Sequence, residues 1–459
     1  MGASVPLPAD LGKVLREGRI DTLMLPAGVS NLQDAKSWRI RGLILRGSGI
    51  TSLEGLPEGL ELLDLHDCPA VSELPLSSDL RFLDITGTSV VELHGSYDRL
   101  KNLGMGFEQK TILQDINHRL SNLSGLFLTG GGDQDWTALL ERIPSALRVL
   151  SLGGVSFDRL GSSLSQLEEL WLEETLVRDL KTVRKSKLHH VVLRGNSRLG
   201  GRDFPEFLLD LEYAGTENTA IDAGRLLSID RLIWVRGNVV NLHSLPSTVT
   251  HLGFPRCEQL RFRGFPPDDD CLSLETESLL ERPPSIARLE IEGPVETLCS
   301  GLPVDALTIT GQALRRGEID FQSLLCPPLN GNHQSSVMSF DNLRRLEIRN
   351  SMTLKAIKGL DTIVPSLVEL AVVNVPLQTL PPLPRSLKIL DIRRTSVTQL
   401  PQELRDHPAL EVLIVDPAQL QSLENLPASV RSLYFVEANI DIETPFLRAS
   451  LGGRYGVKY

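Results

Sequence analysis

The sequence is poor in cysteine and aromatic residues, and it has no long apolar run. Its 459 residues include 5 cysteines without a C-x-x-C pair, so it offers neither a disulfide framework nor a thiolate zinc site, and a reducing compartment fits it. No stretch approaches the roughly 18 consecutive apolar residues of a membrane-spanning helix, and the amino terminus lacks the basic start and apolar core of a secretory signal. We therefore expect neither membrane insertion nor classical secretion.

Clustered positive charge is also missing. The chain has 58 acidic and 47 basic residues, which give a formal net charge of −11. Nucleic acids and anionic membranes need clustered Lys and Arg, so we expect neither as a partner. A basic or mixed-charge protein partner fits this balance better. Apolar residues make up 41% of the chain, which is enough to build a core and argues against disorder.

Motifs for catalysis and metal binding are scarce. The glycines at 130–132 and 153–154 are not followed by the Lys-Ser/Thr pair that a phosphate-binding loop requires. Adjacent histidines at 189 and 190 would point to opposite faces of a strand, so only one could serve a given metal site. We expect no catalytic residue, no cofactor, no metal site and no enzyme activity.

The dominant feature is an apolar repeat in the frame L-x-x-L-x-L. It begins at Ile20 and returns every 20 residues up to Leu100, and further frames follow up to Val430, mostly 20 to 24 residues apart. Two longer steps hold only weak frames, which open at Asp269 and Phe321. These two are either degenerate repeats or excursions from the repeat.

The repeat predicts a solenoid. Each L-x-L core is a short strand whose leucines turn inward while their neighbours face solvent. One unit cannot bury its leucines alone, so neighbouring units stack into a parallel sheet with a continuous core. About ten residues remain for the return segment, and its frequent prolines favour an extended path over a long helix. We expect an α/β solenoid: an arc with a parallel β-sheet on the concave face, a mostly extended or short-helical convex side, and about 19–21 repeats.

Three parts follow along the chain. Residues 1–19 are expected to form an N-terminal cap with a short helix, because Leu11, Val14 and Leu15 lie at helical spacing before a glycine. Residues 20–444 form the solenoid, which is irregular at 256–342 where the frame breaks. Residues 445–459 form a C-terminal cap or tail that could cover the last coil, since a bare solenoid end would expose leucines.

Several units combine the frame with proline, among them 380–392 and 426–435. The chain resembles leucine-rich repeat proteins from about Ile20 to Ile440, and these units are similar to the short, proline-containing repeats of bacterial type III effectors. The resemblance implies a non-catalytic protein-recognition module or scaffold, and an effector that acts on a host protein, either cytoplasmic or secreted into a host cell by a type III-like route. Some such effectors carry a ubiquitin-ligase domain with a C-x-D motif. None of the five cysteines has Asp two residues later, so ligase activity is not implied.

The third, fifth, seventh and eighth positions of each frame are expected on the concave face. Aromatic anchors with a charged rim are typical of protein-binding surfaces, and the chain offers both there. The candidate partner-binding residues are Phe82, Asp84, Phe127, Glu169, Trp171, Glu173, Glu174, His190, Arg194 and Glu212. We expect Trp171 to be an exposed anchor with no folding role, and Phe127 to lie two strands away in the same row.

A second charged stretch alternates in sign, as in Arg345, Glu347 and Arg349, and we interpret it as cross-strand pairing without a ligand. Two other functions remain open. An enzyme could hide its site in residues 256–342 if the cysteines, acids and histidine there converge, namely Asp268, Cys271, Cys299, Cys326 and His333. The ligand-sensing part of an immune receptor would require a nucleotide-binding domain that we do not find in this sequence.

Overall fold

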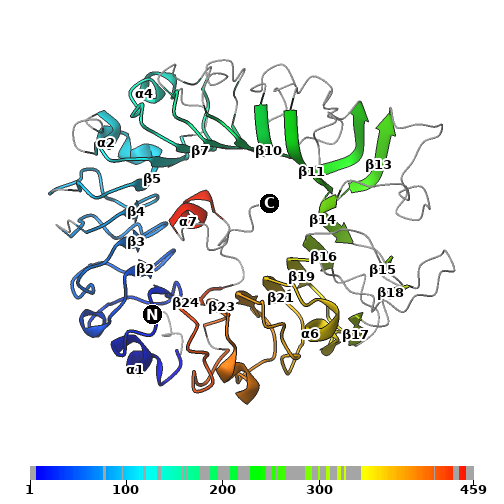
Figure 1. Ribbon diagram of the computed structural model, residues 1–459. Coiled ribbons are helices and arrows are strands. Elements are labelled where there is room, and N and C mark those ends of the chain that lie inside the picture. Colours follow the sequence, from blue (N-terminus) through cyan, green and yellow to red (C-terminus); the bar gives the residue numbers. More distant parts are fainter. Residues whose placement is uncertain are drawn as a thin grey trace. The chain divides into compact units, whose positions relative to one another are not determined.

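The computed structural model forms two compact units, shown as a ribbon in Figure 1. Unit 1 comprises residues 1–60 and 288–442, and unit 2 comprises residues 61–287 and 443–459. The structure describes the following ranges, with the backbone alone over most of those between 207 and 326: 7–75, 79–95, 97–114, 116, 120–131, 136–157, 160, 164–175, 177, 187–194, 207–214, 228–243, 251–254, 257–263, 285–291, 298–299, 306–310, 318–321, 325–326, 343–417, 419–437 and 444–450.

Unit 2 is a parallel sheet in which each strand comes from one frame of the repeat. Its strands are β3 (Leu62–Asp64), β4 (Phe82–Asp84), β5 (Asn102–Gly106), β6 (Gly125–Thr129), β7 (Val149–Gly153), β8 (Glu169–Glu173), β9 (His190–Arg194), β10 (Phe207–Ala214), β11 (Ser228–His243) and β12 (His251–Phe254). Each pairs in parallel with the next, and β13 (Cys257–Arg263) pairs with the second half of β11. The return segments hold little helix: η2 (Phe107–Gln109), α2 (Lys110–Gln114) and α4 (Thr137–Leu140).

Unit 1 is built in the same way. Its parallel strands are β1 (Thr22–Met24), β2 (Gly42–Ile44), β14 (Ser285–Ile291), β16 (Ala306–Thr310), β19 (Arg345–Arg349), β21 (Glu369–Val373), β22 (Ile389–Asp391), β23 (Val412–Val415) and β24 (Ser432–Phe435). The described helices are α1 (Leu11–Arg16), which is the helix expected near the amino terminus, η1 (Ala35–Ser37), α6 (Leu360–Ile363) and η7 (Gln402–Asp406). The prediction of a parallel β-solenoid with little helix is confirmed. Within the part of the chain that is described, no helix has the length and apolar character needed to cross a membrane.

The inward leucines form the core, as the frame predicts. The fourth-position residues of successive units are register partners across the sheet and are fully buried, because alternate side chains of a strand share one face. In unit 2 this row runs Leu63, Leu83, Leu103, Leu126, Leu150, Leu170 and Val191. The shared row explains why no single unit could fold alone.

Many strands are followed by a residue with positive φ, which lies at the eighth position of the frame. Glycine fills it at 47, 87, 130 and 154, and asparagine fills it at 350 and 374. Both residue types adopt this left-handed conformation at low cost. Asp67, Glu174 and Arg394 occupy the same position in three other units, where the conformation costs about 1–2 kcal/mol.

The longer of the two weak steps is an excursion from the repeat. Strand β16 pairs directly with β19, with Leu307 opposite Leu346, so the residues between them do not supply a strand to that part of the sheet. Two short strands within this step pair elsewhere: β17 (Glu318–Asp320) with β20 (Ala356–Lys358), and β18 (Leu325–Cys326) with β15 (Leu298–Cys299). The weak frame at Phe321 is therefore not a degenerate repeat. The frame at Asp269 lies outside the described residues.

The first and last strands of the repeat are neighbours in unit 1. Strand β1 pairs with β2 on one edge and with β24 on the other, so Leu23 lies opposite both Leu43 and Leu433. The amides of Asp21 and Thr22 donate to the carbonyl oxygen of Arg431 at 2.7 and 3.1 Å. The first and last coils thus cover each other along this pairing.

Side-chain contacts reinforce this junction. The carboxylate of Asp10 accepts hydrogen bonds from the amide of Leu423 at 3.0 Å and from the hydroxyl of Ser422 at 3.1 Å. The guanidinium of Arg19 donates to the carbonyl oxygen of Leu426 at 3.0 Å. The segment before the first strand is therefore bonded to the last repeat.

Candidate protein-binding face

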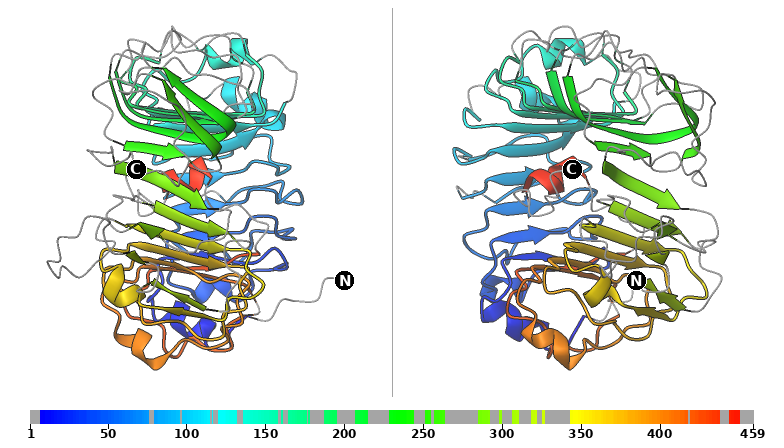
Figure 2. Two further views of the ribbon diagram at one scale, coloured as in Figure 1. Left: turned by 90° about the vertical axis from the view of Figure 1, so that its right-hand side faces the viewer. Right: turned by 45° about the vertical axis from the view of Figure 1, so that its right-hand side comes forward.

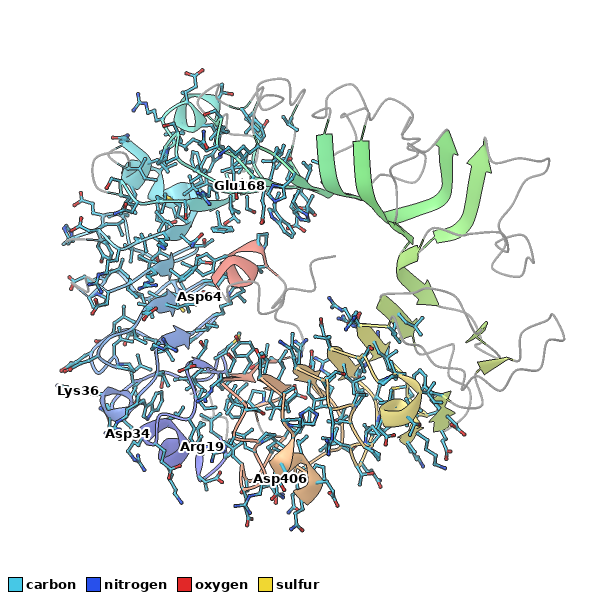
Figure 3. All side chains as sticks on the ribbon, in the orientation of Figure 1. Arg19, Asp34, Lys36, Asp64, Glu168 and Asp406 are labelled. Atoms are coloured by element: carbon cyan, nitrogen blue, oxygen red, sulfur yellow. The ribbon has the colours of Figure 1, made fainter. Side chains whose placement is uncertain are left out.

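The fifth-position residues of unit 2 form a row across the concave face, the face of the sheet opposite the leucine core. We call it the concave row, and Figure 3 marks Asp64 at its start. Register pairs its members strand by strand: Asp64, Asp84, Gly104, Phe127, Ser151, Trp171, Val192 and Glu212. As predicted, Phe127 and Trp171 lie in one row with a single strand between them.

The exposure that we expected for Trp171 is not observed. Its side chain is only 6% exposed, and its ring lies 5.3 Å from the ring of His190 on the next strand. Phe127 is 5% exposed, and its ring meets the ring of Phe446 edge to face at 5.4 Å. The prediction treated the fifth position as open to solvent. Large rings there instead lean on side chains of neighbouring strands and of the tail.

Four of the candidate residues lie at the two ends of β8, directly after it, and at the start of β9. Glu173 and Glu174 are exposed, and Glu169 and His190 are half-buried. Glu169 is the register partner of His190, and Trp171 lies between Glu169 and Glu173 on the same face of β8. We call Glu169, Glu173 and Glu174 the acidic rim.

The other candidates are more scattered. Asp84 is buried: its Oδ1 accepts a hydrogen bond from the amide of Thr86 at 2.9 Å, and its Oδ2 lies 3.5 Å from Nδ1 of His66. These contacts give Asp84 a structural role in its turn. Phe82 is half-buried on the same strand, away from the acidic rim. Arg194 and Glu212 are described by their backbone, which places Arg194 opposite Glu173 and Glu212 opposite Val192.

The repeat pattern does not predict where the tail lies. Helix α7 (Pro445–Ser450), in unit 2, packs on β5 and β6, where Phe446 and Leu447 are both 2% exposed. We expected a cap or tail that could cover the last coil, because of its apolar residues. No periodic signal in the sequence links this segment to β5 and β6.

The alternating charges of unit 1 pair with one another. Nε of Arg345 lies 3.4 Å from the carboxylate of Glu369, its register partner on the next strand, as the cross-strand interpretation predicts. Asp391 instead pairs with Arg393 two residues along its own chain, with both carboxylate oxygens bonded at 2.7 to 3.0 Å. Glu347 and Arg349 pair in the same way. Residues two apart on a strand share a face, so the pairing is partly within strands.

Asp416 lies beside this network, and its carboxylate accepts the backbone N–H of Arg394. Burial raises the pKa of Asp416 above its ordinary value of 3.8, although the Arg394 amide and the nearby guanidinium groups oppose the shift. A raised pKa in the folded state means that Asp416 stabilises the fold below its ordinary pKa. That stability is lost as the pH rises through the folded pKa.

Asp416→Asn is therefore expected to unfold at a higher temperature than the wild type at pH 7, because the amide keeps an acceptor oxygen without a half-buried charge. The advantage should shrink as the pH falls toward 3.8, where the wild-type carboxyl gains its proton. Thermal unfolding measured between pH 3 and 7 checks this, with the exposed Asp406→Asn as the control. A variant less stable than the wild type at pH 7 would contradict the assignment.

A metal site would need several ligand side chains to lie together among the described residues. No group of three or more His, Cys, Asp or Glu side chains among them could hold a metal ion. Of the five residues that an enzyme site at 256–342 would have to bring together, Asp268, Cys271 and His333 lie outside the described residues. The backbones of Cys299 and Cys326 are register partners in the β15–β18 pair.

The chain matches no protein-family model and no curated protein. Among solved structures it is similar to YopM from Yersinia enterocolitica WA-314, with 17% identity and a TM-score of 0.27 over 91% of this chain and 78% of that one. It is also similar to the circular LRR protein CroV588, with 14% identity and a TM-score of 0.29 over 94% of this chain and 78% of that one. The similarity to the mouse RP105/MD-1 complex has 16% identity and a TM-score of 0.32 over 92% of this chain and 72% of that one. Identities and TM-scores this low carry no argument about function. By its own frames, strand register and leucine core, the chain is a leucine-rich repeat solenoid.

Proposed function

We propose that this chain is a non-catalytic protein-recognition module that binds a basic or mixed-charge protein through the concave face of unit 2. The observation that carries the proposal is the acidic rim, which surrounds the Trp171–His190 pair with exposed or half-buried carboxylates. A charged rim around a packed aromatic centre is the usual anatomy of a protein-binding patch. Arg194 and Glu212, on the adjoining strands, are further proposed contacts of this partner.

The backbone of Glu174 supports a role for its side chain. Six units place glycine or asparagine at this left-handed position, whereas Glu174, like Asp67 and Arg394, adopts it with a charged side chain at a cost in stability, and the Glu174 carboxylate is exposed. Residues kept in costly conformations cluster at functional sites. Glu174 is therefore a residue from which a partner would gain its charge contacts.

More specifically, we propose that the chain is a bacterial effector or scaffold that binds a host protein in the cytoplasm, after type III-like secretion into the host cell. It rests on the likeness of the proline-containing units to those of such effectors. The net charge of −11 suits a basic partner surface, because opposite charges steer association.

Charge reversal tests the proposal. Glu173→Lys with Glu174→Lys is expected to weaken a partner captured from host-cell or bacterial extracts at least tenfold, measured by titration of the purified partner. The matched control is Glu54→Lys with Glu58→Lys, which changes the net charge equally at two exposed positions of unit 1. If both double variants bind the partner as tightly as the wild type, the acidic rim is not the site.

A further inference from the structure

We infer that helix α7 is a removable occupant of the concave face, and that the patch it covers on β5 and β6, which we call the α7 patch, binds an amphipathic helical segment of the partner protein. The inference rests on the proposed function of this face. Figure 2 shows α7 (red) in two views, beside the strand face of unit 2. If α7 occupies the place of the partner's helix, the tail competes with the partner for the same surface.

Three concave positions of the α7 patch are glycines. Gly104 and Gly106 on β5 and Gly125 on β6 are all buried, although their frame positions face away from the leucine core. A Cβ at Gly104 would lie 2.6 Å from the Asp84 carboxylate, so the Asp84 side chain lies over this glycine. Phe127, next to Gly104 in the concave row, supplies the aromatic ring that α7 meets.

Helix α7 covers the α7 patch with two apolar residues that are adjacent in the sequence. Phe446 meets Phe127 edge to face, with an angle of 86° between the rings, and Leu447 is also buried. Edge-to-face pairing at this separation is favourable for aromatic rings. The α7 patch therefore favours a short helix in which an aromatic residue is followed directly by an aliphatic one.

The helix has the features of a reversible occupant. It is 6 residues long, well below the length at which an isolated helix is stable in water, so it forms only while it is docked. The burial of Phe446 and Leu447 has to offset the entropy lost when this segment is ordered. A longer amphipathic helix with the same apolar pair and basic residues could also reach the acidic rim, and it would displace α7.

The experiment uses a labelled peptide of residues 443–459 and the full-length chain. We expect the peptide to bind Phe446→Ala at least tenfold more tightly than the wild type, since the variant's own tail no longer competes. Adding Phe127→Ala to that variant should weaken peptide binding at least tenfold. Val91→Ala, at a residue that is 56% exposed, is the control and should bind as weakly as the wild type. The captured partner should also bind Phe446→Ala more tightly than it binds the wild type.

Equal binding of the peptide to the wild type and Phe446→Ala, or binding to neither, overturns the inference. A wild-type dimer that Phe446→Ala dissociates would assign the α7 patch to the tail of a second copy and would overturn the partner helix. Hydrogen exchange of the wild type gives a test that needs no variant: the amides of α7 should exchange at least tenfold faster than those of β5 and β6, and equal rates would overturn the inference. The acidic-rim variants leave the α7 patch intact, so failure of the proposed function and failure of this inference give different results.

Discussion

Leu23→Asp is expected to open the last repeat of the chain together with the first. Leu23 is fully buried between Leu43 and Leu433, so the change places an unpaired carboxylate in a core that β1 shares with β24. Burying such a charge costs several kcal/mol. The free energy of unfolding should fall by that amount, and the amides of β24 should lose protection in hydrogen exchange as much as those of β2.

The control for this change is Val91→Asp, which adds the same carboxyl at a largely exposed residue and should leave stability nearly unchanged. If Leu23→Asp loosens β1 and β2 while β24 keeps its protection, the two end coils are energetically independent. That outcome would contradict the shared core, in spite of the backbone hydrogen bonds between Asp21, Thr22 and Arg431.

Trp171→Ala is expected to lower the free energy of unfolding by about 3–5 kcal/mol, the usual loss when a buried tryptophan is removed. The side chain is only 6% exposed and packs on His190, so its removal leaves a cavity between β8 and β9. Denaturant unfolding measures the loss. Trp38→Ala is the matched control. Trp38 is half-buried, so its removal should lower the free energy of unfolding clearly less.

From the sequence alone we would expect the opposite result, namely an exposed Trp171 whose removal abolishes binding and leaves stability unchanged. A loss below about 1 kcal/mol would restore that reading, since a surface tryptophan contributes little to folding. The two outcomes differ enough to decide whether Trp171 supports the acidic rim from within or meets the partner directly.

The strands and the core could be predicted because they follow from local chemistry. The alternation in Leu170-Trp171-Leu172 fixes which side chains turn inward, and that pattern repeats with each frame. The row of Phe127 and Trp171 followed from strand register in the same way. The prediction of these positions needed no knowledge of distant contacts.

The burial of the two aromatic rings could not be predicted from the frame. Phe127 is covered by Phe446, which lies in the tail and outside the repeat, and no periodic pattern relates the two residues. The two interpretations of the weak frame at Phe321, a degenerate repeat or an excursion, could not be distinguished for a related reason. An apolar triplet matches the pattern whether it lies in the sheet or, as here, in the excursion between β16 and β19.

The pairing of β1 with β24 constrains how this repeat array can change in length. An open array can gain or lose a unit at its end, because only one interface has to be remade. Here a unit added before β1 or after β24 would have to lie between these two strands, which would separate them by a further strand spacing of about 4.8 Å and break their pairing. New sequence is accommodated instead within return segments, as between β16 and β19, where the chain lengthens while the strands on either side remain neighbours.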